Sequence, residues 1–120
     1  MPHIVIHGLN SIDFGETEIA LIESNLSGAI VLIEELQLKE GCISYSFPLD
    51  PTIMSDDVPV VIFVECLFDK PERTTEVRKK LAEDIGRMFR STAEAWRKVG
   101  EVVVFVKRFD PEKDGFYRSV

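Results

Sequence analysis

The sequence predicts an α+β protein, a two-layer α/β sandwich with two helices on one face of a four-stranded mixed sheet. The order strand, helix, strand occurs once in residues 1–50 and again in residues 58–108, followed by a tail at 109–120. Each connection is long enough to join parallel strands, and such crossovers are almost always right-handed. A chain of 120 residues forms one domain of ordinary size, so we expect both units to share one core.

The first unit contains a strand, a long helix and a second strand. Apolar and polar residues alternate over 2–9, which is typical of a strand. Over 16–38 apolar residues recur at steps of three and four, which predicts an amphipathic helix. Its middle, 24–28, is poor in helix-forming residues and leaves a kink or two shorter helices open. Gly41 is expected to end the helix, and 42–47 alternates as the second strand.

The second unit repeats this order. Residues 58–68 form an apolar strand, and Pro71 lies near the first turn of the helix that follows. That helix carries apolar residues along one side over 77–99, although the capping-box spacing at Ser91 allows a break and a restart. Residues 101–108 form the fourth strand, and the tail beyond it is polar.

Two of the predicted strands are apolar at odd and even positions alike. This holds for 58–68 and for 102–106, and it is typical of strands buried on both faces. Two helices can cover only one face of a four-stranded sheet. A monomer would expose a larger apolar patch than monomers usually do, so we expect another copy of the chain to cover the second face.

Composition excludes several function classes. The net charge is −7 with basic residues spread along the chain, whereas nucleic-acid binding needs a concentrated positive face. No signal peptide precedes the first strand, and the apolar runs are too short to span a bilayer, so we expect no membrane partner and a cytoplasmic protein. Cys42 and Cys66 fall on predicted strands without metal-binding spacing, and we expect buried thiols in a reducing compartment.

The amino terminus carries a candidate catalytic group. The sequence starts Met1-Pro2 and enters the first strand at once. Removal of Met1 would expose the secondary amine of Pro2, and burial without a counter-charge disfavours the protonated form of such an amine. The ring fixes φ, so the strand behind it aims the nitrogen. A proline at this position can also be incidental.

Besides the doubled strand-helix-strand order, several short stretches of the sequence match a known family. They lie at Pro2, at 47–48, at Pro59, at 67–70 and at 115–116. Together with the doubly apolar sheet they resemble the tautomerase superfamily, in which macrophage migration inhibitory factor and 5-carboxymethyl-2-hydroxymuconate isomerase are closest in size. The resemblance covers essentially the whole chain, by layout more than by identity. It is strongest to a bacterial branch that starts Met-Pro-His and ends in a short glycine-containing tail. It implies a homotrimer whose three sheets line a central barrel with the helices outside, and no cofactor.

The resemblance also implies a role for Pro2. In the superfamily the amino-terminal proline is the general base that moves a proton between carbon and oxygen of a 2-keto acid or its enol. An apolar surround from Ile4, Phe68 and Phe105 would favour the neutral amine. Phe68 also falls where the superfamily uses a backbone group beside the proline.

Three cations are candidates for binding a substrate carboxylate. Lys39 falls close to a pocket lysine of macrophage migration inhibitory factor, Lys70 has a counterpart just past the third strand, and Arg108 ends the fourth strand. An arginine near residue twelve, which binds carboxylate in 4-oxalocrotonate tautomerase, is absent. The pocket Tyr and Asn of the fourth strand are replaced by Val103 and Phe105, so the resemblance does not identify the substrate.

Other polar residues on the predicted strands have weaker functional interpretations. His3 and His7 share a strand face, but no third ligand is identifiable, and we predict no metal site. Glu65 interrupts an apolar strand and could pair across a subunit interface or face the barrel lumen. Lys107, beside Arg108, is either a source of positive charge or a solvated strand end.

Two hypotheses follow. In the first, the chain is a cofactor-independent keto–enol tautomerase or isomerase for a small carboxylate-bearing 2-keto or enol metabolite, with Pro2 as the base. In the second, the same scaffold is a non-catalytic trimeric ligand-binding or interaction protein, since fold does not fix function. If Met1 stays attached, the nitrogen of Pro2 is an amide without a basic lone pair, and the first hypothesis fails.

Overall fold

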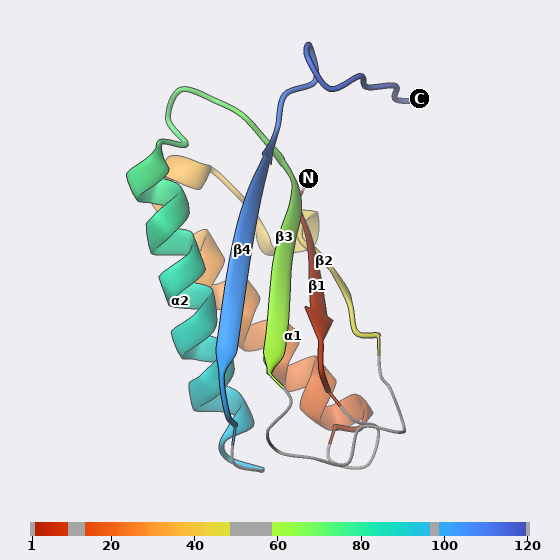
Figure 1. The fold of residues 1–120 in the computed structure, drawn as a ribbon, viewed down its shortest axis with the longest axis vertical. Coiled ribbons are helices and arrows are strands. Elements are labelled where there is room, and N and C mark those ends of the chain that lie inside the picture. The colour runs from red at the N-terminus through yellow and green to blue at the C-terminus, as the bar shows by residue number, and fades with distance from the viewer. Residues whose placement is uncertain (1, 10–13, 49–58, 97–98, 120) are drawn as a thin grey trace.

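The computed structural model describes residues 2–9, 14–48, 59–96 and 99–119. They form two layers, a four-stranded sheet and two helices that cover one of its faces (Figure 1). The elements in chain order are β1 (His3–His7), α1 (Glu16–Val31), the short 3-10 helices η1 (Glu34–Leu36) and η2 (Glu40–Cys42), β2 (Ser44–Ser46), β3 (Val60–Phe68), α2 (Thr75–Ala93) and β4 (Val102–Phe109). The predicted α+β two-layer architecture is confirmed.

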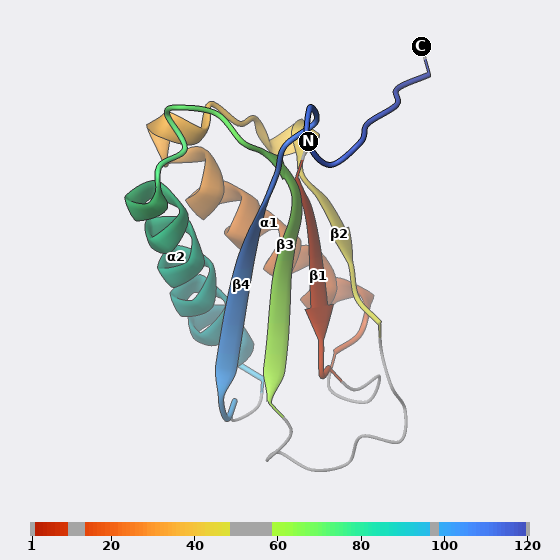
Figure 2. The same cartoon turned by 45° about the horizontal axis from the view of Figure 1, so that its top comes forward.

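The sheet has the strand order β2-β1-β3-β4. β1 and β2 are parallel, β3 and β4 are parallel, and β1 and β3 pair antiparallel at the centre. Each β-α-β unit therefore contributes one parallel pair, as the two long connections predicted. In this arrangement β1 and β2 start at the same end of the sheet at which β3 and β4 finish (Figures 1 and 2). We call this end, at the top of Figure 1, the Pro2 end.

The core lies between the sheet and the helices. Alternate residues of β1 and β3 point into it, and Ile4, Ile6 and Ile62 are completely buried. The helices contribute apolar residues at steps of three and four, which places them on one face of each helix. These residues are Ile22, Leu26 and Ile30 from α1 and Leu81, Ile85 and Phe89 from α2.

The first helix is shorter than predicted but unbroken. α1 runs through 24–28 without interruption, because the burial of Leu26 and Ser27 against the rest of the fold outweighs the poor helix propensity of this stretch. The predicted continuation to residue 38 is wrong. Ile33 takes an extended backbone, with φ −83° and ψ 96°, and the chain then turns back through η1. This turn keeps Ile33 and Leu36 in the core after the helix has ended.

The second unit differs from the prediction at its helix boundaries. α2 starts after Thr74, whose side chain accepts a hydrogen bond from the Val77 amide at 3.3 Å, and not at Pro71. It ends at Ala93 without a restart at Ser91, because residues 94–96 form a turn. Neither helix is long and apolar enough to cross a membrane, within the residues that the structure describes.

The strand boundaries and the cysteines also differ. β2 covers only Ser44–Ser46 of the predicted 42–47, since Cys42 belongs to η2. Both Cys42 and Cys66 are free and exposed, so the prediction of buried thiols is wrong. Cys66 lies in β3 at an irregularity in the pairing with β4 and has a left-handed backbone, with φ 61°. This extra residue turns the Cys66 side chain outward and returns Leu67 to the core.

Candidate functional site

The sheet face away from the helices is apolar and partly exposed. Side chains alternate between the two faces of a strand, so the residues of β1, β3 and β4 that do not enter the core share this face. We call it the open face; it carries His3, Val5, His7, Val61, Phe63, Glu65, Val103, Phe105 and Lys107. At its centre the rings of Phe63 and Phe105 stack at 5.4 Å, and Phe105 remains 49% exposed. The sequence predicted that two strands are buried on both faces. In a single chain the helices cover one face of these strands, and the open face stays partly exposed.

A polar band crosses the open face toward the Pro2 end. Glu65 lies opposite His3 in the β1–β3 pairing, and its carboxylate is 3.9 Å from the ammonium of Lys107. The Nδ1 atom of His3 is 2.7 Å from the hydroxyl of Ser44. Glu65 therefore has a partner within its own chain, which neither interpretation of the sequence anticipated. No cluster of three His, Cys, Asp or Glu side chains suited to a metal ion occurs in the described part of the chain.

Pro2 stands at the head of β1 and is buried. Its carbonyl accepts a hydrogen bond from the Ser44 amide at 3.2 Å, which ties it to the start of β2. β1 begins at His3, opposite Glu65, whereas β3 continues to Phe68 in pairing with β4. The last residues of β3 and β4 therefore extend past Pro2 as a ledge on which a small molecule could rest beside the proline.

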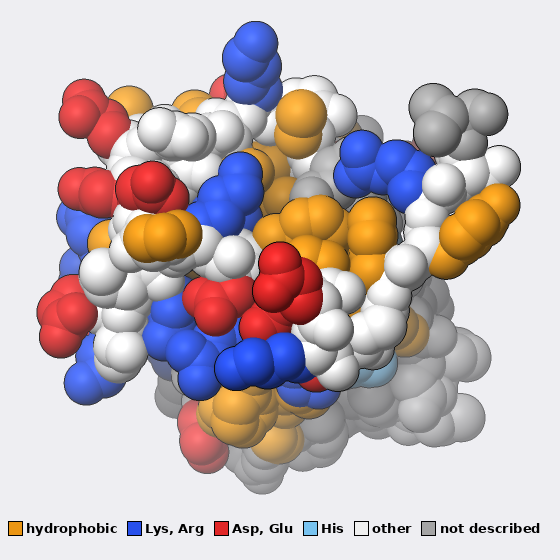
Figure 3. Space-filling view, turned by 90° about the horizontal axis from the view of Figure 1, so that it is seen from above, with side chains coloured by type: hydrophobic (Ala, Val, Ile, Leu, Met, Phe, Trp, Pro, Cys, Tyr) orange, Lys and Arg blue, Asp and Glu red, His pale blue; other side chains and the backbone are white. Residues whose placement is uncertain are grey.

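Three aromatic rings form the surface of the ledge. Phe68 lies 5.6 Å from Phe109 across the β3–β4 pairing, and Phe116 from the tail packs edge-on against Phe68 at 5.1 Å and against Phe109 at 6.2 Å. We call these three residues the aromatic cluster. Seen from above, hydrophobic side chains gather at this end between basic side chains and acidic ones (Figure 3). The tail is largely exposed, as its polar sequence indicates, but Phe116 packs back onto the sheet.

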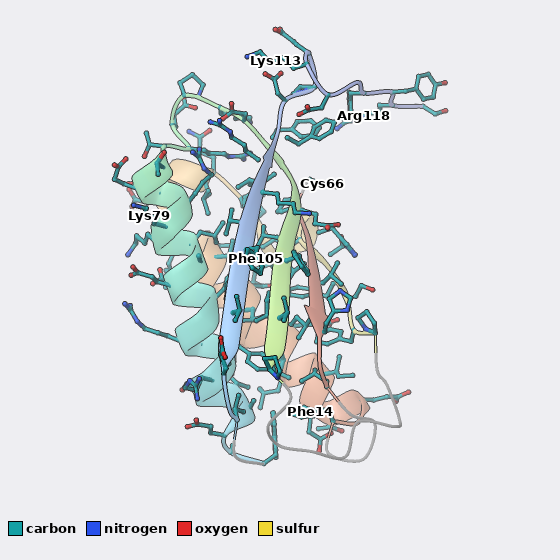
Figure 4. All side chains as sticks on the ribbon, in the orientation of Figure 1. Phe14, Cys66, Lys79, Phe105, Lys113 and Arg118 are labelled. Atoms are coloured by element: carbon teal, nitrogen blue, oxygen red, sulfur yellow. The ribbon has the colours of Figure 1, made fainter. Side chains whose placement is uncertain are left out.

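The structure brings most of the predicted site residues to the Pro2 end. Lys39 directly precedes η2, the turn that leads into β2, and Lys70 lies in the turn after β3; both are exposed. Phe68 is on the open face, whereas Arg108, paired with Leu67, alternates to the other face. Phe105 is on the open face but farther down β4 (Figure 4).

Arg108 does not face the aromatic cluster. It lines a shallow cavity of about 410 Å³ together with Asp69, Asp110, Lys113 and Asp114. Three carboxylates and two cations share this cavity, so its charge disfavours a further carboxylate from a substrate. Lys107 is also engaged, since it pairs with Glu65 and lies over the Phe63 ring at 5.2 Å.

Comparison with known proteins gives one consistent result. No protein-family model matches the sequence, and no curated protein matches it. Among solved structures, a fused 4-oxalocrotonate tautomerase in an asymmetric trimer is similar with a TM-score of 0.69 at 12% identity, over 95% of this chain and 91% of that one. A member of the cis-3-chloroacrylic acid dehalogenase family gives 0.66 at 15%, over 96% and 80%. A malonate semialdehyde decarboxylase inhibited by 3-bromopropiolate gives 0.61 at 15%, over 99% and 91%.

The chain has the tautomerase fold. The similarity extends over nearly the whole chain while sequence identity is low, so it is shape that the neighbours share. The resemblance drawn from the Met-Pro start and the doubled β-α-β layout is therefore confirmed at the level of fold.

Within this tautomerase fold, Arg73 is a residue of the Pro2 end that sequence reasoning missed. It is only 5% exposed, and its guanidinium donates to the Phe68 carbonyl and to the Leu36 carbonyl, both at 2.8 Å. Its Nε is buried and has no partner among the described residues. Burial lowers the pKa of Arg73, and nearby Glu72 opposes this only in part.

Arg73 thus connects the end of β3 to η1 and fixes the backbone beneath the aromatic cluster. The sequence gives no signal for it, because Pro71-Glu72-Arg73-Thr74 reads as an ordinary polar turn. Both acceptors are backbone carbonyls, which any residue type supplies, so no residue pattern could have indicated the pairing.

Proposed function

We propose that this chain is a cofactor-independent keto–enol tautomerase or isomerase that acts on a small carboxylate-bearing 2-keto or enol metabolite. Pro2 is its general base. One observation carries the proposal: Pro2 is buried at the head of β1, directly beside the ledge, in a chain with the tautomerase fold. The named activities of the structural neighbours, a tautomerase, a dehalogenase family and a decarboxylase, belong to those proteins and leave the substrate of this chain open.

The chemistry follows from a neutral amine in an apolar setting. After removal of Met1, the nitrogen of Pro2 accepts a proton from the carbon next to the keto group. The proton then passes to the keto oxygen as the enol forms, and the reverse sequence gives ketonisation. Burial of Pro2 favours the neutral amine, because a charged group loses hydration in an apolar surround. The rings of the aromatic cluster give the ledge an apolar surface on the open face.

The substrate carboxylate needs a cation at the same end. Lys39 and Lys70 are exposed there and neither belongs to an ion pair among the described residues, so both are candidates. Arg108 is the weaker candidate because its cavity already holds three carboxylates. Phe68 supplies the apolar wall beside Pro2, and its carbonyl is held by Arg73.

We also propose that the chain assembles as a homotrimer in the cytoplasm. The aromatic centre of the open face supports this, because another copy would cover Phe63 and Phe105. Several structural neighbours are described as trimers. In this assembly Phe105 lies at a subunit interface. Two free thiols, Cys42 and Cys66, fit a reducing compartment. Light scattering should give about three times 13.6 kDa, and a monomer at all concentrations would contradict the assembly.

The catalytic proposal is tested at Pro2. Intact-mass measurement should show that the native protein has lost one methionine, and the enzyme should then ketonise phenylenolpyruvate or 2-hydroxymuconate. Pro2→Ala should lower kcat/KM at least about 100-fold, the lower range for a positioned general base. Pro48→Ala, at an exposed proline after β2, is the matched control and should keep full activity.

Unchanged turnover in Pro2→Ala would overturn the assigned role. If the protein has a free Pro2, binds small carboxylates and turns over neither substrate, the alternative of a non-catalytic ligand-binding trimer is favoured instead.

A further inference from the structure

The cations at the Pro2 end differ in how they are engaged. Arg73 donates to two carbonyls, Lys107 pairs with Glu65, and Arg108 shares a cavity with three carboxylates. Arg118, in the tail, makes no ion pair and no hydrogen bond among the described residues. Its guanidinium carbon lies 5.7 Å from the centre of the Phe116 ring.

A defined turn precedes the segment that carries Arg118. The Asp114 amide donates to the Asp110 carbonyl at 2.8 Å, and the Asp110 amide donates to the Asp114 carboxylate at 2.8 Å. The Glu112 amide donates to the Asp110 carboxylate at 2.9 Å. Gly115 follows with φ 76°, a conformation that favours glycine, and redirects the chain so that Phe116 reaches Phe68.

We propose that Arg118 is a carboxylate-binding residue of this site and that the tail delivers it to the ledge of its own chain. The ligand is a planar, unsaturated carboxylate whose apolar part lies against the aromatic cluster. This inference rests on the proposed function, whose cationic partner it supplies. Figure 4 shows Arg118 on the tail, beyond the ends of β3 and β4.

The chemistry of the guanidinium supports this role. Its planar fork of N–H donors matches the two oxygens of a carboxylate, which a lysine ammonium does not. A neighbouring aromatic ring attracts the cation without using a hydrogen-bond acceptor, so the N–H donors remain available. Phe68, Phe109 and Phe116 also form an apolar wall on one side, and a charge-assisted hydrogen bond is stronger in less polar surroundings. Neither Lys39 nor Lys70 lies over an aromatic ring in the part of the chain that the structure describes.

The test is calorimetric binding of two non-reacting probes, trans-cinnamate and its neutral analogue cinnamamide. Wild-type protein should prefer cinnamate. Arg118→Ala should weaken cinnamate binding about tenfold, at the lower end of what a hydrogen bond to a charged group contributes, and should leave cinnamamide binding unchanged. Arg118→Lys should restore only part of the preference. Lys113→Ala is the matched control, because Lys113 lies in the same tail but lines the cavity that contains Arg108.

Three outcomes overturn the inference: equal cinnamate affinity in Arg118→Ala and wild type, an equal loss in Lys113→Ala, or no preference for cinnamate in the wild type. The binding test does not depend on catalysis, and Pro2→Ala should keep the preference for cinnamate. Retained turnover in Pro2→Ala would therefore remove the proposed function without deciding the role of Arg118.

Discussion

The proposed assembly can be tested most sharply at Phe105. Its ring stacks on Phe63 at the centre of the open face, and about half of its surface is exposed in a single chain. If another copy covers this face, Phe105→Ala removes apolar area that is buried only in the assembly. The monomer itself loses little besides the stacking contact. We therefore expect the substitution to weaken association far more than folding.

The magnitude follows from the exposed area. A phenylalanine side chain of about 200 Å², 49% exposed, offers on the order of 100 Å² to a partner. At about 25 cal/mol per Å² this is about 2.5 kcal/mol for each subunit. Each subunit contact should weaken by a factor of about 70.

Sedimentation velocity over a range of concentrations measures this change. The expected result for Phe105→Ala is a shift of the trimer-to-monomer transition to higher concentration, with an unchanged far-UV circular dichroism spectrum. Leu32→Ala is the control, because Leu32 is 80% exposed on the helix layer and should leave assembly unaltered. A Phe105→Ala protein that dissociates at the same concentration as wild type would refute the proposed interface.

Three further predictions concern stability. Gly8 has φ 95°, and an added Cβ would lie 2.5 Å from the Pro59 carbonyl oxygen, so Gly8→Ala should destabilise the fold by roughly 2 kcal/mol or more in urea unfolding. Gly28→Ala, in α1 with open space around it, should stabilise by about 0.5–1 kcal/mol, and a loss there would contradict the helix. Burial raises the pKa of Tyr45 from 10.0 to about 12, although its hydrogen bond with Ser27 opposes this. The folded chain holds this proton more tightly than the unfolded chain, so the contribution of Tyr45 to stability is complete below pH 10 and disappears toward pH 12. The free energy of unfolding of Tyr45→Phe should therefore change less with pH over this range than that of wild type. An equal change in the two proteins would contradict the raised pKa.

The fold was predictable because its signals are periodic and local. The alternation around Ile4 and Ile6 identified β1, and the repeated strand-helix-strand order required two parallel pairs. The end of α1 was not predictable in the same way. A 3-10 turn has three residues per turn and keeps Ile33 and Leu36 on one side, so the apolar spacing continues after the helix has ended.

The bulge at Cys66 shows a second limit of periodic reasoning. Strict alternation cannot indicate which residue of β3 is the additional one, and a one-residue shift reverses the faces of everything that follows. The pairing of Leu67 with Arg108 and of Phe68 with Phe109 is known only once this residue has been located. The placement of Phe68 on the open face and of Arg108 on the other face depends on it.

The candidate site was predictable in part. The parallel pairing of β1 with β2 brings the starts of both strands to the same end of the sheet, and the antiparallel β1–β3 pairing places the end of β3 there too. These pairings explain why Pro2, Lys39 and Phe68 lie at one end. The contributions of Arg73 and of the tail depend on contacts with backbone carbonyls and on a ring packing across many residues of sequence. Neither leaves a pattern in the sequence.

The ion pair between Glu65 and Lys107 divides the aromatic residues of the open face into two surfaces. Phe63 and Phe105 lie on the side of the sheet centre, and the aromatic cluster lies on the side of the Pro2 end. Both charged side chains are substantially exposed in the single chain, and burying them fully under another copy would cost desolvation that a 3.9 Å contact repays poorly. A partner copy is therefore expected to close over the central rings and to leave the cluster beyond the ion pair to a ligand. On this argument Phe105→Ala should impair assembly, whereas Arg118→Ala should impair carboxylate binding without changing assembly.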